Sequence, residues 1–437
     1  MKLIKIFFAL ILLFSNQLMS QDFNAKQFTL KNGMRVVVIE NPRAPVIAQM
    51  IWYDFGSNVE KPGKSGLAHF MEHLMFKGTK KFPENYYSNF LSKIGGSENA
   101  FTSYDYTAYY QIYPSQHFEK IIELEADRMK NLTLTKKNVE TERKVILEER
   151  FQRIESDPSS QLDESMRSIL YPNHYYGRPI IGWKHEIENL NYDDVKAFYK
   201  KHYNPSNSLL VISGNVKLSE SKKIVKKYFS GIKNSNNEKY LEISDPDLKS
   251  QVFVELKHPT VQQSIWKKLY RVDSYKDSII KGIALDLGLK ILAGGTSSSL
   301  YDEFVNKKKL FSMIGGFYNG LARNQGYVYF YAIPKNSMDE KSIDELINKQ
   351  LKKSIKNDIT IEKLETEKKK YLFDSIYQMD GILKPSEIIG EAITVGLKLK
   401  DIEKWNDNLE KVTVELIKDE MNKFLENKNY VIGGLKQ

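Results

Sequence analysis

The stretch Ser65-Gly-Leu-Ala-His69-Phe-Met-Glu72-His73-Leu-Met-Phe-Lys-Gly78 decides how the chain folds and what it can do. It predicts a helix over 65–78, with Ser65 as the N-cap and Gly78 as the C′ residue. At about 100° per residue, His69, Glu72 and His73 lie together on one face. The opposite, core-facing stripe consists of apolar side chains at i, i+3, i+4, i+7 and i+8: Leu67, Phe70, Met71, Leu74 and Met75.

The three polar residues of this helix have the chemistry of a metal site. Two imidazoles at i and i+4, His69 and His73, can bind one metal ion, and Glu72 between them can reach a metal-bound water. The order His-x-x-Glu-His is the inverted form of the zinc motif of metalloproteases. Taken alone, the pattern is equally compatible with an ordinary solvated helix face, so a third ligand has to decide between the two interpretations.

Composition restricts what that third ligand can be. The 437 residues include no cysteine, so disulfides and thiolate–metal bonds are excluded, and a metal ion has to be bound by His, Asp or Glu. The net charge of +10 is spread over mixed Lys/Glu stretches, and no nucleic-acid-binding motif is present. The predicted helix 136–154 contains Glu142 and Glu149, which share a face because they are seven residues apart. They are third-ligand candidates, or else solvated acids on a charged helix.

The N-terminus has the features of an export signal. Lys2 and Lys5 precede the apolar run 6–14, and polar residues follow. We therefore expect a signal peptide over 1–20 and a periplasmic or secreted protein with no stable membrane span after cleavage. The alternative is an uncleaved anchor, although the run is too short to span a bilayer.

The remainder predicts an α+β fold of two homologous domains that arose by internal duplication. Each domain is expected to be an α/β sandwich, a mostly antiparallel sheet packed with helices. The expected boundaries are 23–234 for the N-terminal domain, 235–250 for a polar linker and 251–437 for the C-terminal domain. A shift of about 216 residues aligns the two halves and sets Leu285, Gly288 and Leu289 against the metal motif, so the second copy keeps the scaffold without the metal site.

The elements expected in the first half alternate irregularly between strands and helices. A hairpin is expected over 28–39, around Asn32-Gly33. The helix 136–154 is expected to end at Asp157-Pro158. The other expected elements are strands at 46–55, 99–113 and 208–214, and helices at 86–94, 117–132 and 192–202.

Over most of its length the chain resembles the pitrilysin/insulinase family of zinc peptidases. The resemblance rests on four motifs: Gly66–Thr79, Asn99-Ala100-Phe101-Thr102, Glu142-Arg143 with Glu149 downstream, and Tyr203-Asn-Pro-Ser-Asn-Ser-Leu. It implies a zinc-dependent endopeptidase that holds one Zn²⁺ per chain, although manganese or cobalt is not distinguished from zinc by sequence.

The resemblance also implies a role for each matching residue. The family's third ligand lies about 76 residues beyond the second histidine, which leads to Glu149, with Glu148 as the fallback. Glu142 matches a supporting glutamate that orients a ligand. Glu72 is the general base that activates water. Peptide substrates, or small unfolded polypeptides, are expected to pair with an edge strand at Asn99, Ala100 and Phe101.

One departure from the family bears on partners. The family commonly has an arginine and, seven residues later, a tyrosine in its second domain, both held to contact substrate; here Val305 and Ser312 stand in their places. Neither can donate a charged or phenolic hydrogen bond. We therefore expect this chain to be the zinc-bearing subunit of a heterodimer whose second subunit carries the pair. The alternatives are a homodimeric peptidase and a non-catalytic scaffold or chaperone-like subunit.

Overall fold

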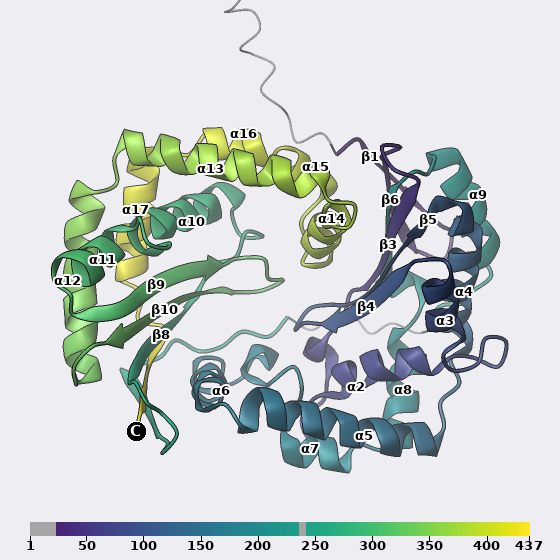
Figure 1. Cartoon of the computed structure of the whole chain (residues 1–437), viewed down its shortest axis with the longest axis horizontal. Helices are drawn as coiled ribbons and strands as arrows, with labels where there is room; N and C mark the ends of the chain where they lie inside the picture. The colour runs from purple at the N-terminus through teal and green to yellow at the C-terminus, as the bar shows by residue number, and fades with distance from the viewer. Residues whose placement is uncertain (1–22, 236–241) are drawn as a thin grey trace, which may run out of the picture.

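The computed structural model describes residues 23–235 and 242–437, and it confirms an α+β fold of two domains, each a helix-packed sheet (Figure 1). The predicted signal peptide 1–20 lies outside the described residues, as does part of the predicted linker. The domain boundaries stay predictions. None of the described helices combines the length and the apolar character needed to cross a bilayer.

The N-terminal sheet has six strands in the order β1-β2-β6-β3-β5-β4. The predicted hairpin over 28–39 is confirmed, because β1 and β2 pair antiparallel on either side of Asn32-Gly33. The single strand predicted over 99–113 is wrong: it is a hairpin of β4 and β5, and residues 103–106 form the turn. The strands are β1 (Ala25–Thr29), β2 (Arg35–Glu40), β3 (Val46–Tyr53), β4 (Ser97–Thr102), β5 (Thr107–Pro114) and β6 (Ser208–Gly214).

Most helices of this half lie where the sequence predicts them. They are α2 (Leu67–Leu74), α3 (Tyr86–Lys93), α4 (Phe118–Asn131), α5 (Lys136–Arg150), α6 (Pro158–Leu170), α7 (Lys184–Asn189), α8 (Tyr192–His202) and α9 (Leu218–Phe229). Helix α6 is a correction. Asp157-Pro158 was expected to end a helix, whereas α5 ends at Arg150, a π-helical segment follows over Phe151–Glu155, and Asp157 caps α6 by accepting from the amides of Ser159 and Ser160.

The C-terminal sheet repeats the topology of the first. Its order is β7-β11-β8-β10-β9, which matches β2-β6-β3-β5-β4, and in both sheets the first two of these strands are parallel. The strands are β7 (Val252–Lys257), β8 (Ile265–Val272), β9 (Phe311–Asn319), β10 (Gly326–Pro334) and β11 (Tyr430–Lys436). The main helices are α10 (Ile279–Ala293), α12 (Glu340–Asn357), α13 (Ile361–Asp380), α14 (Lys384–Thr394) and α17 (Val414–Leu425). This shared topology supports the predicted duplication.

The two halves exchange one helix each. Helix α6 of the N-terminal half packs on the C-terminal sheet, and α14 of the C-terminal half packs on the N-terminal sheet (Figure 1). Both contacts are close: a Cβ at Gly433 would lie 2.3 Å from the sulfur of Met166, and one at Gly390 would lie 2.0 Å from Nε1 of Trp52. Because glycine is what allows these helices to approach, larger residues there would push the halves apart.

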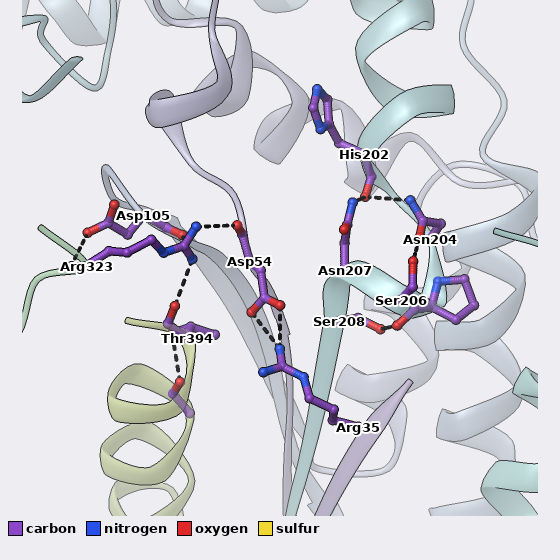
Figure 2. Close-up of polar contacts among 12 residues, drawn as sticks. Arg35, Asp54, Asp105, His202, Asn204, Ser206, Asn207, Ser208, Arg323 and Thr394 are labelled. Atoms are coloured by element: carbon purple, nitrogen blue, oxygen red, sulfur yellow. Dashed lines mark hydrogen bonds and ion pairs between the residues drawn. The ribbon is translucent and has the colours of Figure 1, made fainter. Parts of the chain in front are cut away.

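Arg323, in the β9–β10 loop, ties the halves together (Figure 2). Its guanidinium donates to the carbonyl oxygens of Asp54 (3.1 Å), Asp105 (3.1 Å) and Thr394 (2.7 Å), and its amide donates to the Asp105 carboxylate (3.0 Å). Asp105 belongs to the β4–β5 turn. The C-terminal half therefore holds the turn that carries the outermost strand of the N-terminal sheet.

Candidate metal centre

Helix α2 begins differently from the prediction. Ser65 is not an N-cap: its hydroxyl accepts from the amide of Trp183 (2.9 Å), and α2 starts at Leu67 after Gly66, whose φ is +85°. The carboxylate of Glu60 takes over the capping, since it accepts from the amides of Gly66 (3.1 Å) and Ala68 (2.7 Å). Burial raises the pKa of Glu60 to about 8, although both amides oppose the shift.

The metal motif on α2 is orientated as predicted. The five apolar residues of the stripe are buried, and Gly78, with φ +75°, follows the short 3₁₀ turn after α2. His69 and His73 face α5, and their ring centroids are 4.8 Å apart. Helix α5 is fixed at its start by Thr135, which accepts from the amide of Asn138, and it directs Glu149 toward both rings.

His69, His73 and Glu149 together form a group with the dimensions of a metal site. Oε2 of Glu149 lies 3.5 Å from Nε2 of His69 and 3.4 Å from Nε2 of His73, and the ligand atoms of all three lie within 4.8 Å of one another. Two atoms bound tetrahedrally to one Zn²⁺ at about 2.0–2.1 Å are roughly 3.3–3.4 Å apart. Both distances are long for hydrogen bonds and close to that separation, so the donor set fits zinc.

The protonation states differ between the two histidines. Burial and the neighbouring His73 lower the pKa of His69 to about 4, so its ring is neutral, as a metal ligand requires. Burial also acts to lower the pKa of His73, but the carboxylates of Glu142 and Glu149, one beside each ring nitrogen, outweigh it and raise this pKa to about 9. Zinc binding to His73 would therefore displace a proton.

Glu142 occupies the supporting position that the resemblance implied. Its Oε2 lies 3.3 Å from Nδ1 of His73, and its Oε1 lies 2.6 Å from Nζ of Lys77. A proton on Nδ1 that points at a carboxylate leaves Nε2 free for a metal ion. Glu148, the fallback ligand, is exposed and accepts instead from Gln152 (2.8 Å), so the structure brings only Glu149 to the rings. The roles of His69, His73 and Glu149 as metal ligands stay predictions.

Glu72 projects into a cavity of about 1050 Å³ beside the two histidines. Burial raises the pKa of its carboxyl group, and the hydrogen bond from Thr102 Oγ1 to Oε2 (2.6 Å) opposes this shift. No local pattern predicts this role for Thr102, because the contact depends on β4 lying against α2. A second unforeseen contact joins Arg153 to Oε1 of Glu149 (2.9 Å), and Arg153 lies in the π-helical segment after α5.

The predicted substrate strand lies at the edge of this cavity. Asn99, Ala100 and Phe101 line it, and they belong to β4, the outermost strand of the sheet, whose only paired neighbour among the described strands is β5. Val305 and Ser312 lie elsewhere: Val305 packs against the C-terminal core, and Ser312 donates to the carbonyl of Ile333 (3.2 Å). Within the described ranges, every residue that lines the cavity comes from the N-terminal half.

The predicted alignment of the second copy is off by one residue. In the N-terminal half, α2 and the 3₁₀ turn after it line the cavity with His69, Glu72, His73, Phe76 and Lys77. In the C-terminal half, α10 and the residue after it line the corresponding cavity with Asp286, Leu289, Lys290, Ala293 and Gly294. These two sets have identical spacing at a shift of 217. The expected counterparts Leu285, Gly288 and Leu289 are each one residue short of that register, and a Cβ on Gly288 would meet Met421 at 2.7 Å.

The chain is similar to known zinc proteases in sequence and in fold. The model of the insulinase family (peptidase family M16) matches residues 35–184, and the model of the peptidase M16 inactive domain matches residues 189–371. The zinc protease PqqE of Helicobacter pylori is 31% identical over 339 residues, which cover 76% of this chain and 75% of that protein. The uncharacterized zinc protease YmxG of Bacillus subtilis is 26% identical over 78% of this chain and 81% of its own length. The crystal structure of a protease from Helicobacter pylori superposes with a TM-score of 0.88 at 26% identity and covers 94% of this chain and 99% of that one.

Proposed function

Because the chain belongs to the insulinase family, peptidase family M16, we propose that it is a zinc-dependent endopeptidase. The observation that carries this proposal is the meeting of two imidazole nitrogens and one carboxylate oxygen at 3.4–3.5 Å, with Glu72 beside them in a cavity. His69, His73 and Glu149 hold the metal ion, one per chain.

The chemistry follows from the residues around that group. Zinc, when bound, polarises the scissile carbonyl and lowers the pKa of its bound water. Glu72 removes a proton from the attacking water at a carboxylate oxygen and later delivers it to the leaving amine. Thr102 donates to Oε2 of Glu72, which leaves Oε1 to carry the proton. Glu142 fixes the tautomer of His73.

The substrate class follows from the exposed strand. An extended peptide adds to β4 through main-chain hydrogen bonds, which are largely independent of sequence. Flexible peptides and small unfolded polypeptides can adopt that extended conformation, whereas folded domains cannot. The predicted export signal supports periplasmic or secreted peptides as the substrates.

We further propose that this chain works with a second family subunit. The absence of C-terminal residues from the described cavity lining and the presence of Val305 and Ser312 support this arrangement. The second subunit would supply the arginine and tyrosine. A non-catalytic scaffold is the second candidate function, since residues 189–371 match an inactive-domain model. Glu72 between two histidines argues against it, because a scaffold needs no base there.

Metal removal tests the proposal. The purified chain, alone and mixed with the neighbouring family subunit of its genome, is assayed with internally quenched peptides before and after chelation. We expect cleavage that is lost on chelation and restored by zinc, with the thermal unfolding curve nearly intact because large buried apolar cores stabilise the fold without the metal. Zinc binding without cleavage in either sample would favour the scaffold. Full activity in the lone chain would overturn the two-subunit proposal.

A further inference from the structure

Arg167 on α6 is the cation in the cavity wall that no acid neutralises. The other cations that line the cavity, Lys77 and Arg153, are paired with Glu142 and Glu149. Among residues 23–235 and 242–437, no carboxylate lies within 4.0 Å of the Arg167 guanidinium. Arginine stays ionised at all physiological pH values, so this wall carries an uncompensated positive charge.

Its two natural partners are bound elsewhere. Asp163 and Glu164 precede Arg167 by four and three residues, the positions from which an acid normally pairs with a helical arginine. Lys267 forms an ion pair with Asp163 at 2.8 Å, and the hydroxyl of Tyr329 also donates to that carboxylate at 3.1 Å. Arg150 takes both oxygens of Glu164, each at 2.9 Å. Two buried cations thus keep the neighbouring acids away from Arg167.

Aromatic rings hold the guanidinium instead. Its central carbon lies 4.6 Å from the ring centroid of Tyr327 and 5.5 Å from that of Tyr104, and its polar contact is with the Tyr327 hydroxyl. Cation–π contacts use the faces of the planar group and leave N–H groups at its edges able to donate. Tyr104 comes from the β4–β5 turn and Tyr327 from β10, so both halves fix the orientation of Arg167.

The cavity leads from the metal group to this arginine. Its lining follows β4 from Asn99 to Thr102 and continues through Tyr104 to Arg167. A peptide paired with β4 would therefore extend toward the guanidinium. A planar guanidinium matches a carboxylate, which can accept two parallel hydrogen bonds.

We propose that Arg167 binds a carboxylate of the peptide substrate, so that the enzyme prefers peptides with an acidic group at that distance from the cleaved bond. This inference rests on the proposed function. The carboxylate comes either from an acidic side chain or from the peptide's C-terminus, and Arg167 acts as a specificity-determining residue.

Binding to the full chain tests this without turnover. The zinc-loaded Glu72→Gln variant is titrated into rhodamine-labelled decapeptides of one neutral sequence, which come in three forms. The first form has a C-terminal amide and the second is the free acid. The third form is a set of amides in which one Gln is replaced by Glu at successive positions. We expect one acidic form to bind about tenfold more tightly than the neutral amide, and the tighter one identifies the source of the carboxylate. When Arg167→Met is added to the Glu72→Gln variant, the difference in affinity between the acidic and neutral peptides should disappear. The affinity for the neutral peptide should stay within about twofold.

Two controls separate charge from folding. Arg43→Met removes one exposed positive charge outside the cavity and should leave the tenfold preference intact. Arg167→Lys keeps the positive charge but loses the planar pair of N–H donors, so it should retain part of the preference for acidic peptides. A merely structural role of Arg167 would not give this partial preference. Equal binding of all three peptides, or a preference that survives Arg167→Met, would overturn the inference while leaving the peptidase proposal in place. Loss of all peptide binding in the parent variant would instead refute the peptidase proposal.

Discussion

Three corresponding elements, two helices and one strand, surround a cavity in each half of the molecule, and the two cavities differ in chemistry. In the N-terminal half α2, α5 and β4 surround His69, Glu72 and His73; in the C-terminal half α10, α13 and β9 surround Asp286, Leu289 and Lys290 within about 470 Å³. On the facing helix, Glu142 and Glu149 correspond to Glu367 and Asp374, again seven residues apart.

The difference shows how one scaffold balances its acids in two ways. In the C-terminal cavity the Lys290 ammonium lies 3.2 Å from the Asp286 carboxylate and 4.5 Å from the ring centroid of Tyr371, so the chain provides its own cation. Leu289, in the register of Glu72, cannot transfer a proton. In the N-terminal cavity Lys77 and Arg153 pair with Glu142 and Glu149, while His69, His73 and Glu149 also form the group that we propose binds a metal ion.

Replacing Glu72 should have the largest effect, because it removes the proposed base, whose place in the other copy is taken by Leu289. Glu72→Gln keeps the shape of the side chain and loses the base, so kcat should fall about a thousandfold while the zinc content stays at one per chain. Glu148→Gln, in the same cavity wall, should change kcat less than twofold. Steady-state kinetics and metal analysis measure both, and retained turnover in Glu72→Gln would remove Glu72 as the base.

Glu149→Gln tests the third ligand. An amide oxygen is a weaker ligand than a carboxylate, and so zinc affinity should fall at least about a hundredfold, as measured by competition with a chromophoric chelator. Glu142→Gln, which alters the partner of His73 and Lys77 but no proposed ligand, should lower affinity about tenfold. Unchanged affinity in Glu149→Gln, with a loss in Glu148→Gln, would transfer the ligand role to Glu148.

Thr102 offers a finer test of how β4 serves Glu72. Thr102→Val is nearly isosteric but cannot donate, so kcat should fall about tenfold with KM and zinc content nearly unchanged. Thr102→Ser restores the hydroxyl and should restore most of kcat. A serine variant as impaired as the valine variant would show that the methyl packing, rather than the hydrogen bond, is what matters.

His174 lies where the two halves meet, next to Asn324 of the β9–β10 loop. We expect it to make the stability of the fold depend on pH. Burial lowers the pKa of His174 to about 4, below the unfolded value of about 6.5, so the unfolded chain binds this proton more readily. The contribution of the neutral ring is complete above pH 6.5 and is lost as the pH falls toward 4. Wild type should therefore lose about 2 kcal/mol over that range that His174→Gln does not lose.

Urea unfolding of the two chelated proteins at several pH values measures this difference, and subtracting the curves cancels the groups they share. His185→Gln removes an exposed imidazole and should follow wild type throughout. A constant difference between wild type and His174→Gln would contradict the prediction.

Local sequence patterns were enough to predict the metal helix and the seven-residue spacing on α5. The failures arise where a local pattern fits more than one structure or where another group takes the place of the expected one. Ser65 is a good capping residue, yet the Glu60 carboxylate reaches the helix start through a loop, which no local pattern encodes. Asp157-Pro158 fits the end of one helix and the start of the next equally well, since aspartate caps and proline is favoured at the first turn.

Two further features could not be predicted for physical reasons. An apolar helix face does not specify which sheet it covers, so the exchange of α6 and α14 is invisible in the sequence. The alignment error arose because α10 is apolar nearly all round, so Leu285 and Leu289 match a buried stripe in either register. Only the cavity lining of Asp286 and Lys290 identifies the register.

Replacing Lys290 should have the smallest effect of these substitutions. If Lys290 only balances Asp286, then Lys290→Met should change the free energy of unfolding by less than about 1 kcal/mol, because the pair is partly exposed and such pairs contribute little. Zinc content and kcat should stay at the wild-type values, in contrast to any substitution of His73, its counterpart in register. Urea unfolding and peptide cleavage measure both. A loss of kcat in Lys290→Met would mean that the second cavity contributes to the reaction, and the contrast between a catalytic copy and a self-neutralised copy would fail.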